Sequence, residues 1–225
     1  PFPSGILNMN RDWRWKSMLP QWPGSKWRRF RDRCRHGQGP YAHLFAPYDG
    51  DQVVAIDCET TGLDSRTAEL VSIAAVVIKD GRVLSSQGLD VKLMPPDSLK
   101  EDTIRIHRLR PVDLEGGESV RDALDALLAF IGNRPLVGWC VAFDVAMINR
   151  YLRPLMGFDL PNDTIELSAL YQKKMRYWQP EMTPDLRFDA MAGALQVPVM
   201  ERHTARGDAV TSALMYLQLQ KSTLN

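Results

Sequence analysis

A short apolar run that ends in two closely spaced carboxylates constrains the fold of this chain more than any other feature. Residues 53–56 have the composition of a buried strand, and Asp57 and Glu59 follow them, just before a Thr-Thr-Gly turn at residues 60–62. Residues i and i+2 of a strand point to one face, so the two carboxylates are expected to project together. Such a pair is most often solvated, but two anions held this close repel each other unless a cation or a shared proton lies between them. Hard oxygen ligands favour Mg²⁺ or Mn²⁺, and the pattern predicts a divalent metal site.

Length and composition fit one main globular domain. The 225 residues are 44% apolar and 24% charged, as in an ordinary soluble chain. No stretch approaches the ~20 consecutive apolar residues of a membrane span and no signal peptide opens the chain, so we expect no membrane contact and a cytoplasmic location. The widely spaced Cys34, Cys58 and Cys140 predict neither a disulfide framework nor a zinc site, and we expect Cys58 and Cys140 to be buried.

The net charge of +1 hides a strong asymmetry along the chain. Residues 1–46 hold nine Lys or Arg and two Asp, so this part carries +7 and the remainder −6. Residues 1–49 also contain six prolines and four of the six tryptophans, without a sustained apolar period, and they are interpreted as an N-terminal extension to a domain at 50–225. Tryptophans among basic residues can grip phosphates and stack bases, or bury their indoles against the body or a protein partner. The sequence leaves the role of the extension open.

Beyond residue 50 the chain alternates between predicted strands and predicted helices. Strands at 53–56, 70–78 and 83–91 are expected to form an antiparallel meander, with a hairpin turn at 79–82. Thr183 and Pro184 fit the N-cap and first position of a helix. This alternation predicts an α/β fold with helices on both faces of a sheet and ligands near strand ends. The other predicted elements are helices at 120–131, 144–155, 184–195 and 205–221, and strands at 136–140 and 162–167.

Three further residues suit metal-dependent chemistry. Asp144 follows the predicted strand 136–140 at the start of a helix, where a carboxylate could equally serve only as a partner of the helix dipole. His203 and Asp208 lie five residues apart at the start of the last predicted helix. A histidine before a helix is usually incidental, but its pKa suits proton abstraction near neutral pH.

Three motifs in this order resemble the DnaQ-like (DEDDh) family of 3′-5′ exonucleases, which includes the exonuclease domain of the DNA polymerase III epsilon subunit. The resemblance runs from about residue 52 to 219 and implies a ribonuclease H-like fold, with a mixed five-stranded sheet flanked by helices. The motifs are Asp57-Cys58-Glu59-Thr60-Thr61-Gly62, the segment 138–144 that ends in Phe143-Asp144, and His203-x-Ala205-x-x-Asp208-Ala209.

The resemblance also implies a role for each residue of these motifs. Asp57 would bridge two divalent cations, Mg²⁺ or Mn²⁺, with Glu59 and Asp208 completing the first metal site and Asp144 supporting the second. His203 would deprotonate the attacking water, and a nucleoside 5′-monophosphate would leave the 3′ end of a nucleic acid. The terminal nucleoside would contact Thr60, Thr61, Ile106 and His107.

Two positions depart from the family pattern. Arg108 follows His107 where a glycine is common, and Trp139-Cys140 stands where many members carry His-Asn. Trp139 could reshape the cleft or act as a core aromatic. Single-stranded DNA is the expected substrate; an exoribonuclease of the oligoribonuclease or RNase T type and a non-catalytic nucleic-acid-binding module are the alternatives. The residues give no prediction of oligomeric state.

Overall fold

A computed structural model of the chain describes residues 23–221, and in this range the strands form one mixed sheet. The order across the sheet is β3-β2-β1-β5-β6, and β4 also pairs with β2; the bounds are β1 Val53–Thr60, β2 Leu70–Lys79, β3 Arg82–Val83, β4 Leu89–Lys92, β5 Leu136–Gly138 and β6 Thr164–Glu166. β1 and β2 run antiparallel, whereas β1, β5 and β6 run parallel. The mixed sheet confirms the predicted fold class.

The predicted strand at 83–91 is two short strands on the same edge of β2. A 3₁₀ turn at Ser85–Gln87 separates β3 from β4, because a Ser-Ser-Gln-Gly run lacks the branched and aromatic side chains that suit a strand. At Gly88 a Cβ would come within 3.1 Å of the Ala75 carbonyl oxygen, so the glycine lets the chain return close to β2. The broken strand occupies one edge position, and the sheet keeps five positions across its width.

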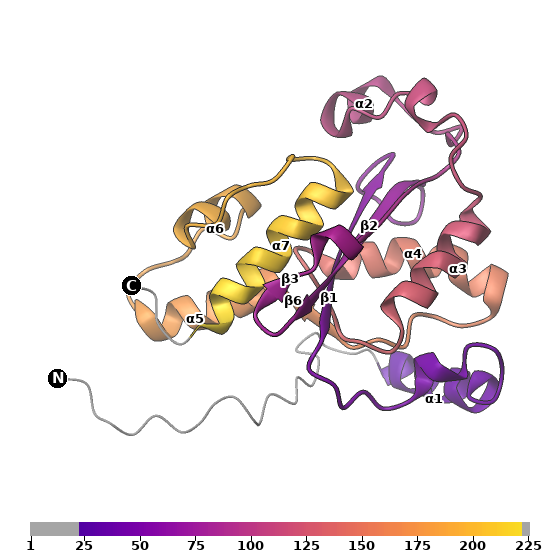
Figure 1. Cartoon of the computed structure of the whole chain (residues 1–225), viewed down its shortest axis with the longest axis horizontal. Helices are drawn as coiled ribbons and strands as arrows, with labels where there is room; N and C mark the ends of the chain where they lie inside the picture. The colour runs from indigo at the N-terminus through magenta and orange to yellow at the C-terminus, as the bar shows by residue number, and fades with distance from the viewer. Residues whose placement is uncertain (1–22, 222–225) are drawn as a thin grey trace.

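Helices cover both faces of the sheet. Figure 1 shows α3 and α4 on one side, α7 with α5 and α6 on the other, and α2 standing clear at the top. One apolar core lies between the sheet and α3 and α4, and a second lies under α5, α6 and α7. The helices are α1 Pro23–His36, α2 Glu101–His107, α3 Val120–Ile131, α4 Val141–Met156, α5 Leu167–Trp178, α6 Phe188–Ala194 and α7 Ala205–Gln220, with 3₁₀ turns at Ala42–Phe45 and Pro111–Leu114.

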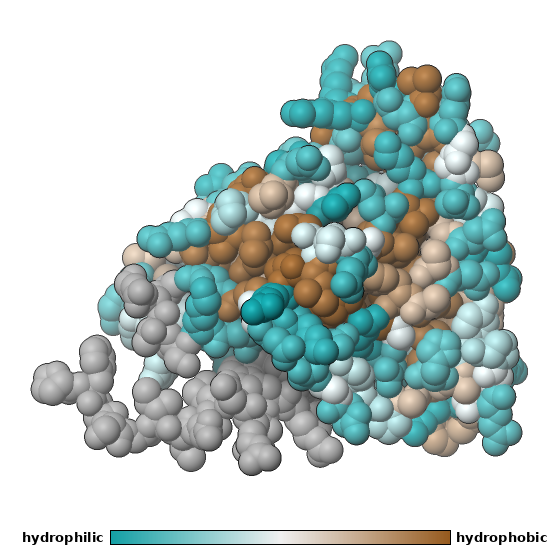
Figure 2. Space-filling model, viewed as in Figure 1, coloured by the Kyte–Doolittle hydropathy of each residue, from teal (hydrophilic) through white to brown (hydrophobic). Residues whose placement is uncertain are grey.

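The last helix crosses the middle of one sheet face. Its N-cap Thr204 accepts the Gly207 N–H, and its side chains pack on both β1 and β2. Figure 2 shows apolar surface gathered over α7 and the adjoining part of the sheet, where Val210, Leu214 and Leu217 are only half-buried. The predicted helix at 205–221 is therefore confirmed to within one residue.

Other predicted elements differ from the structure. The helix expected at 184–195 begins only at Phe188, because the Asp185 carboxylate accepts the Arg187 N–H at 3.0 Å and holds the preceding residues in a turn. Thr183 and Pro184 consequently do not start a helix, and α2 and α5 were not expected. Cys58 is buried as predicted, but Cys140 is exposed because it caps α4 at the edge of the sheet.

The helix α1 lies within the predicted N-terminal extension and packs against the end of α4. Its inward side carries Asp32, which is 2% exposed and accepts two hydrogen bonds from Arg153, at 2.6 and 3.0 Å. Arg153 also pairs with Asp159, and the His36 ring lies 5.1 Å from the Phe158 ring. Ionic anchoring of this kind leaves little apolar period in the sequence. Trp13, Trp15 and Trp22 lie outside the described residues.

Within residues 23–221, no helix is both long enough and apolar enough to cross a lipid bilayer.

We expect Asp32→Ala to loosen α1 from the body. Removing one partner of a buried ion pair leaves Arg153 with Asp159 alone, so the free energy of unfolding should fall by about 2 kcal/mol and Tm by ~4–8 °C. Backbone amides of residues 23–36 should then exchange faster with deuterium. The exposed Asp90→Ala is the matched control. Unchanged exchange in α1 would contradict the anchoring role of Asp32.

Candidate active site

The side-chain alternation of β1 puts two carboxylates beneath the last helix. Val54, Ile56 and Cys58 point into the core under α3 and α4, so Asp57 and Glu59 point to the opposite face, which α7 covers. Asp208, in the first turn of α7, completes the group. One oxygen from each of Asp57, Glu59 and Asp208 lies within 4.8 Å of the others. The structure thus brings together three of the four carboxylates that the sequence singled out.

A glycine allows α7 to start close to the loop before it. A Cβ at Gly207 would collide with the carbonyl oxygens of Met200 and Glu201, so no larger residue fits there without moving the loop. Thr211 in the next turn accepts the Met200 N–H at 2.9 Å and holds the same loop. These contacts fix the first turn of the helix, and with it Asp208, over β1.

Asp144 reaches the same strand from the other side. It lies in the first turn of α4, is 4% exposed, and its Oδ1 accepts the Cys58 N–H at 3.0 Å. The pairing of β1 with β5 reaches only Ala55↔Val137, so this side chain takes over as the acceptor further along β1. Asp144 is thereby fixed on the residue between Asp57 and Glu59, although it is not part of the group of three.

Glu166 orients the start of α4, and the sequence did not identify it. Its two carboxylate oxygens accept the N–H groups of Cys140 and Val141, both at 3.0 Å, and one also accepts the Ser168 N–H. Cys140 has a left-handed backbone with φ 58°, which turns the chain sharply from β5 into the helix. A carboxylate that caps two helices at once depends on tertiary packing and has no local sequence signal.

Arg202 is a second residue that the sequence did not identify, and it is the cation beside the cluster. It forms ion pairs with Asp208 and with Asp189, and its guanidinium lies 4.3 Å from the centre of the Phe188 ring. Trp139 packs edge-on against the same ring and donates its indole N–H to the Leu186 carbonyl oxygen. Trp139 is therefore a half-buried core aromatic, and it packs against the Phe188 ring that Arg202 contacts.

Burial and mutual repulsion raise the pKa of every carboxyl group in the cluster. Burial, followed by the charges of Asp144, Asp208 and Glu59, raises the pKa of Asp57 well above its usual value. Burial raises the pKa of Glu59 to about 7 and that of Asp144 to about 8, the latter against the opposing effect of the Cys58 hydrogen bond. Burial also raises the pKa of Asp208 despite Arg202. One arginine leaves the cluster short of positive charge.

This lack of positive charge fits a divalent cation. Asp208 Oδ1 is buried and has no hydrogen-bond partner among the described residues, while its Oδ2 receives Arg202 and the His203 N–H. Carboxylate oxygens are the ligands that Mg²⁺ and Mn²⁺ prefer. Asp57, Glu59 and Asp208 could therefore hold one such ion.

The predicted general base lies at the edge of the cluster. His203 is exposed, has a left-handed backbone with φ 64°, and its charge lowers the pKa of Asp208. The structure therefore brings His203 to Asp208, as its place in the motif led us to expect.

The four residues expected to contact the terminal nucleoside lie in two segments joined by hydrogen bonds. The Thr60 hydroxyl donates to the Gly62 carbonyl oxygen, and the Thr61 hydroxyl accepts the Glu69 N–H and bonds Ser98 at 2.8 Å. Both threonines are buried, so their hydroxyls shape the turn and tie it to the segment that leads into α2.

Ile106 and His107 end helix α2, which stands clear of the sheet in Figure 1. Ile106 is half exposed, whereas His107 is buried, with Nδ1 accepting the Leu109 N–H and Nε2 lacking a partner among the described residues. Arg108 then adopts φ 61°, a left-handed conformation that explains why glycine is common at this position in the family.

Comparison with known proteins agrees with this geometry. The sequence model of the Exonuclease family matches residues 54–216. A PolC-type DNA polymerase III from Clostridium perfringens is 30% identical over 165 residues, which are 72% of this chain and 11% of the polymerase. An oligoribonuclease from Streptomyces griseus is 29% identical over 143 residues, 58% of this chain and 70% of that protein.

Solved structures show the same fold. Exonuclease I superimposes with a TM-score of 0.64 at 14% identity, over 76% of this chain and 41% of that one. E. coli exonuclease I in complex with a dT13 oligonucleotide gives a TM-score of 0.60 at 15% identity, over 75% of this chain and 40% of that one.

The solved structures define the fold as ribonuclease H-like, and the sequence model defines the family. The chain belongs to the Exonuclease family, whose model spans all three motifs, and the resemblance to DnaQ-like exonucleases is confirmed. It covers only about a ninth of the length of the PolC-type polymerases it matches.

The raised pKa values predict how pH affects the metal-free protein. In the unfolded chain these carboxyl groups titrate near pH 4, whereas the pKa of Glu59 is about 7 and that of Asp144 about 8 in the folded state. The folded state therefore keeps protons that the unfolded state releases, and the contribution of the cluster to stability falls as pH rises from 4 to 8.

Asp57→Asn should relieve this repulsion. We expect the Tm of the variant, measured in EDTA, to exceed that of the unchanged protein by ~3–6 °C at pH 8, with a much smaller difference at pH 4. Mg²⁺ should raise the Tm of the unchanged protein more than that of the variant. A difference between the two proteins that does not grow with pH would contradict the charge repulsion described here.

Proposed function

We propose that this chain is a metal-dependent 3′-5′ exonuclease that releases nucleoside 5′-monophosphates, with single-stranded DNA as its substrate. The observation that carries the proposal is the meeting of Asp57, Glu59 and Asp208 within 4.8 Å, with Asp144 fixed to the same strand. Two buried and two half-buried carboxylates with one arginine beside them would destabilise a purely structural element, which argues against a non-catalytic module.

Each residue has a distinct role in the proposed reaction. Asp57, Glu59 and Asp208 would hold one divalent cation, Mg²⁺ or Mn²⁺, and Asp144 with Asp57 would support a second. Two bound cations would supply an activated water and would stabilise the charge on the leaving 3′-oxygen. His203, exposed next to Asp208, takes the proton from the attacking water.

The segments around Thr60 and α2 would bind the terminal nucleoside. The Thr60 and Thr61 hydroxyls are used within the protein, so the turn presents its backbone, while Ile106 offers an exposed apolar side chain and His107 a buried one with a free ring nitrogen. The base and sugar of the terminal nucleotide would contact both segments.

DNA is favoured over RNA by the PolC-type relatives and by the fold neighbour that binds dT13. An exoribonuclease is the second candidate, because the oligoribonuclease relative is matched over 70% of its length, against 11% of the polymerase. None of the site residues named above distinguishes a ribose, which carries a 2′-hydroxyl, from a deoxyribose. The cytoplasmic location expected from the sequence stays a prediction.

The direct test is hydrolysis of matched 5′-labelled 20-nucleotide DNA and RNA oligomers in Mg²⁺ or Mn²⁺. We expect a DNA ladder that shortens from the 3′ end, and a loss of at least ~10³-fold in Asp57→Asn, because that change removes a metal-binding carboxylate. Asp90→Asn, on the exposed edge strand, is the matched control. A faster RNA ladder would select the second candidate, and equal rates in Asp57→Asn and the control would reject the metal site.

His203→Ala tests the proposed base separately from the metal ligands. We expect kcat to fall by ~10²–10⁴ while the Mn²⁺ affinity, measured by titration calorimetry, changes little. His43→Ala is the matched control, since His43 is exposed on the 3₁₀ turn at Ala42–Phe45. A His203→Ala protein with unchanged kcat would show that another group accepts the proton.

A further inference from the structure

The outward side of α1 combines exposed aromatic rings with arginines. Trp27 and Phe30 are 76% and 63% exposed and meet edge to face, with their ring centres 6.4 Å apart. Arg31 and Arg35 follow at helical spacing on the same stripe, opposite the side that Asp32 anchors to Arg153. Exposed large aromatics that make few contacts with their own protein are unusual and mark an interaction surface.

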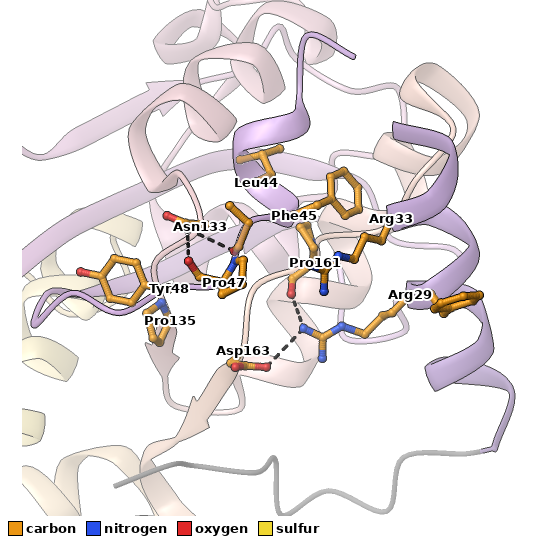
Figure 3. Close-up of a pocket in the computed structure, with 12 residues that line it drawn as sticks. Arg29, Arg33, Leu44, Phe45, Pro47, Tyr48, Asn133, Pro135, Pro161 and Asp163 are labelled. Atoms are coloured by element: carbon orange, nitrogen blue, oxygen red, sulfur yellow. Dashed lines mark hydrogen bonds and ion pairs between the residues drawn. The ribbon is translucent and has the colours of Figure 1, made fainter. Parts of the chain in front are cut away.

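Beside this stripe, a groove separates α1 from the loops that lead into the parallel strands. It encloses about 440 Å³, and Figure 3 shows Arg29 and Arg33 projecting from α1 on one side, with Tyr48 and Pro135 on the other. Arg29 bonds the Pro161 carbonyl oxygen and Asp163, whereas Arg33 has no side-chain partner among residues 23–221. The groove therefore offers one uncommitted guanidinium between aromatic rings.

Charge decides what this surface can bind. Arg31, Arg33 and Arg35 make no ion pair within the described residues, unlike Arg28 and Arg29, which face Asp159 and Asp163. Residues 1–22 carry three basic residues and one acidic residue, so they are a poor electrostatic complement to more arginines. A polyanion with flat apolar groups is the matching ligand, and single-stranded nucleic acid has both features.

We propose that α1 and its groove bind the upstream part of a single-stranded nucleic acid whose 3′ end lies at the carboxylate cluster. Bases stack on Trp27 and Phe30, and phosphates meet Arg31, Arg33 and Arg35. This inference rests on the proposed function for the direction of the strand, and it goes further by assigning a second, non-catalytic binding surface.

The position of the groove sets the length of strand that is needed. Tyr48, Pro135 and Asp163 precede β1, β5 and β6, so the groove lies at the end of the parallel strands opposite the cluster. About 13 Å of strand separates Val53 from Asp57, and the residues that line the groove lie beyond Val53, so a bound strand has to cover more than this distance along the surface. A trinucleotide with its 3′ end at the cluster has no nucleotides left to fill the groove, whereas a 20-nucleotide oligomer can fill both places.

The test compares two variants of α1 with a control on another surface. The variants are Trp27→Ala/Phe30→Ala and Arg31→Ala/Arg33→Ala/Arg35→Ala; the control, Arg82→Ala/Arg176→Ala/Tyr177→Ala, also removes exposed arginines and an exposed aromatic. All are placed in the Asp57→Asn background. Binding of fluorescein-labelled dT20 and of a labelled trinucleotide is followed by anisotropy over a range of NaCl concentrations in EDTA.

Each α1 variant should weaken dT20 binding at least tenfold and leave trinucleotide binding unchanged, while the control changes neither. The slope of log affinity against log salt should fall by about 2 in the triple-arginine variant, at ~0.7 per lost phosphate contact. Equal losses in variants and control would overturn the proposal.

One further outcome would also count against it. Unchanged dT20 affinity with loss of a dimer in sedimentation would show that α1 docks on the acidic body of a second copy. Binding is measured without turnover, so it tests the α1 surface alone. The proposed exonuclease activity is tested separately, by hydrolysis of the trinucleotide and the 20-nucleotide oligomer by the unchanged chain.

Discussion

The rest of the structure depends on holding four mutually repelling carboxylates around one strand end. Asp57 and Glu59 cannot turn away, because the alternation of β1 that buries Val54 and Ile56 also fixes their direction. Each of the other two carboxylates sits in the first turn of a helix, where free N–H groups offset part of its charge. The repulsion that remains favours cation binding, and it also lowers the stability of the metal-free folded state.

Both helix starts are held by contacts that lie outside the carboxylates themselves. Glu166 caps α4 from the neighbouring strand, and Gly207 lets α7 close on the loop that carries Arg202. Arg202 in turn rests on Phe188, which Trp139 supports. A shift in any of these would move Asp144 or Asp208 relative to β1, so the site depends on packing well beyond the residues that could touch a substrate.

The sequence predicted the features that local backbone geometry determines, and it missed the residues whose positions depend on tertiary contacts. Period-two alternation and helix-start positions singled out the four carboxylates as candidates, and the resemblance to the exonuclease family joined them into one set. Glu166 contacts a segment far from it in the chain, and Arg202 lies in an irregular loop, so no regular residue spacing predicts either contact. The helix expected from residue 184 was delayed by the Asp185 side chain, and α1 lacked an apolar period because Asp32 anchors it through charge.

The charge asymmetry of the chain follows from the same cluster. A body of net charge −6 that concentrates four carboxylates in one place repels a phosphate backbone around that cluster unless cations are bound there. Metal ions bound there would attract only the terminal phosphates, since screening limits their reach to about 8 Å in physiological salt. Holding a longer strand requires positive charge elsewhere on a rigid part of the fold. The buried Asp32–Arg153 pair holds α1 against the body, so the arginines of α1 that make no ion pair within residues 23–221 keep a fixed position relative to the carboxylate cluster.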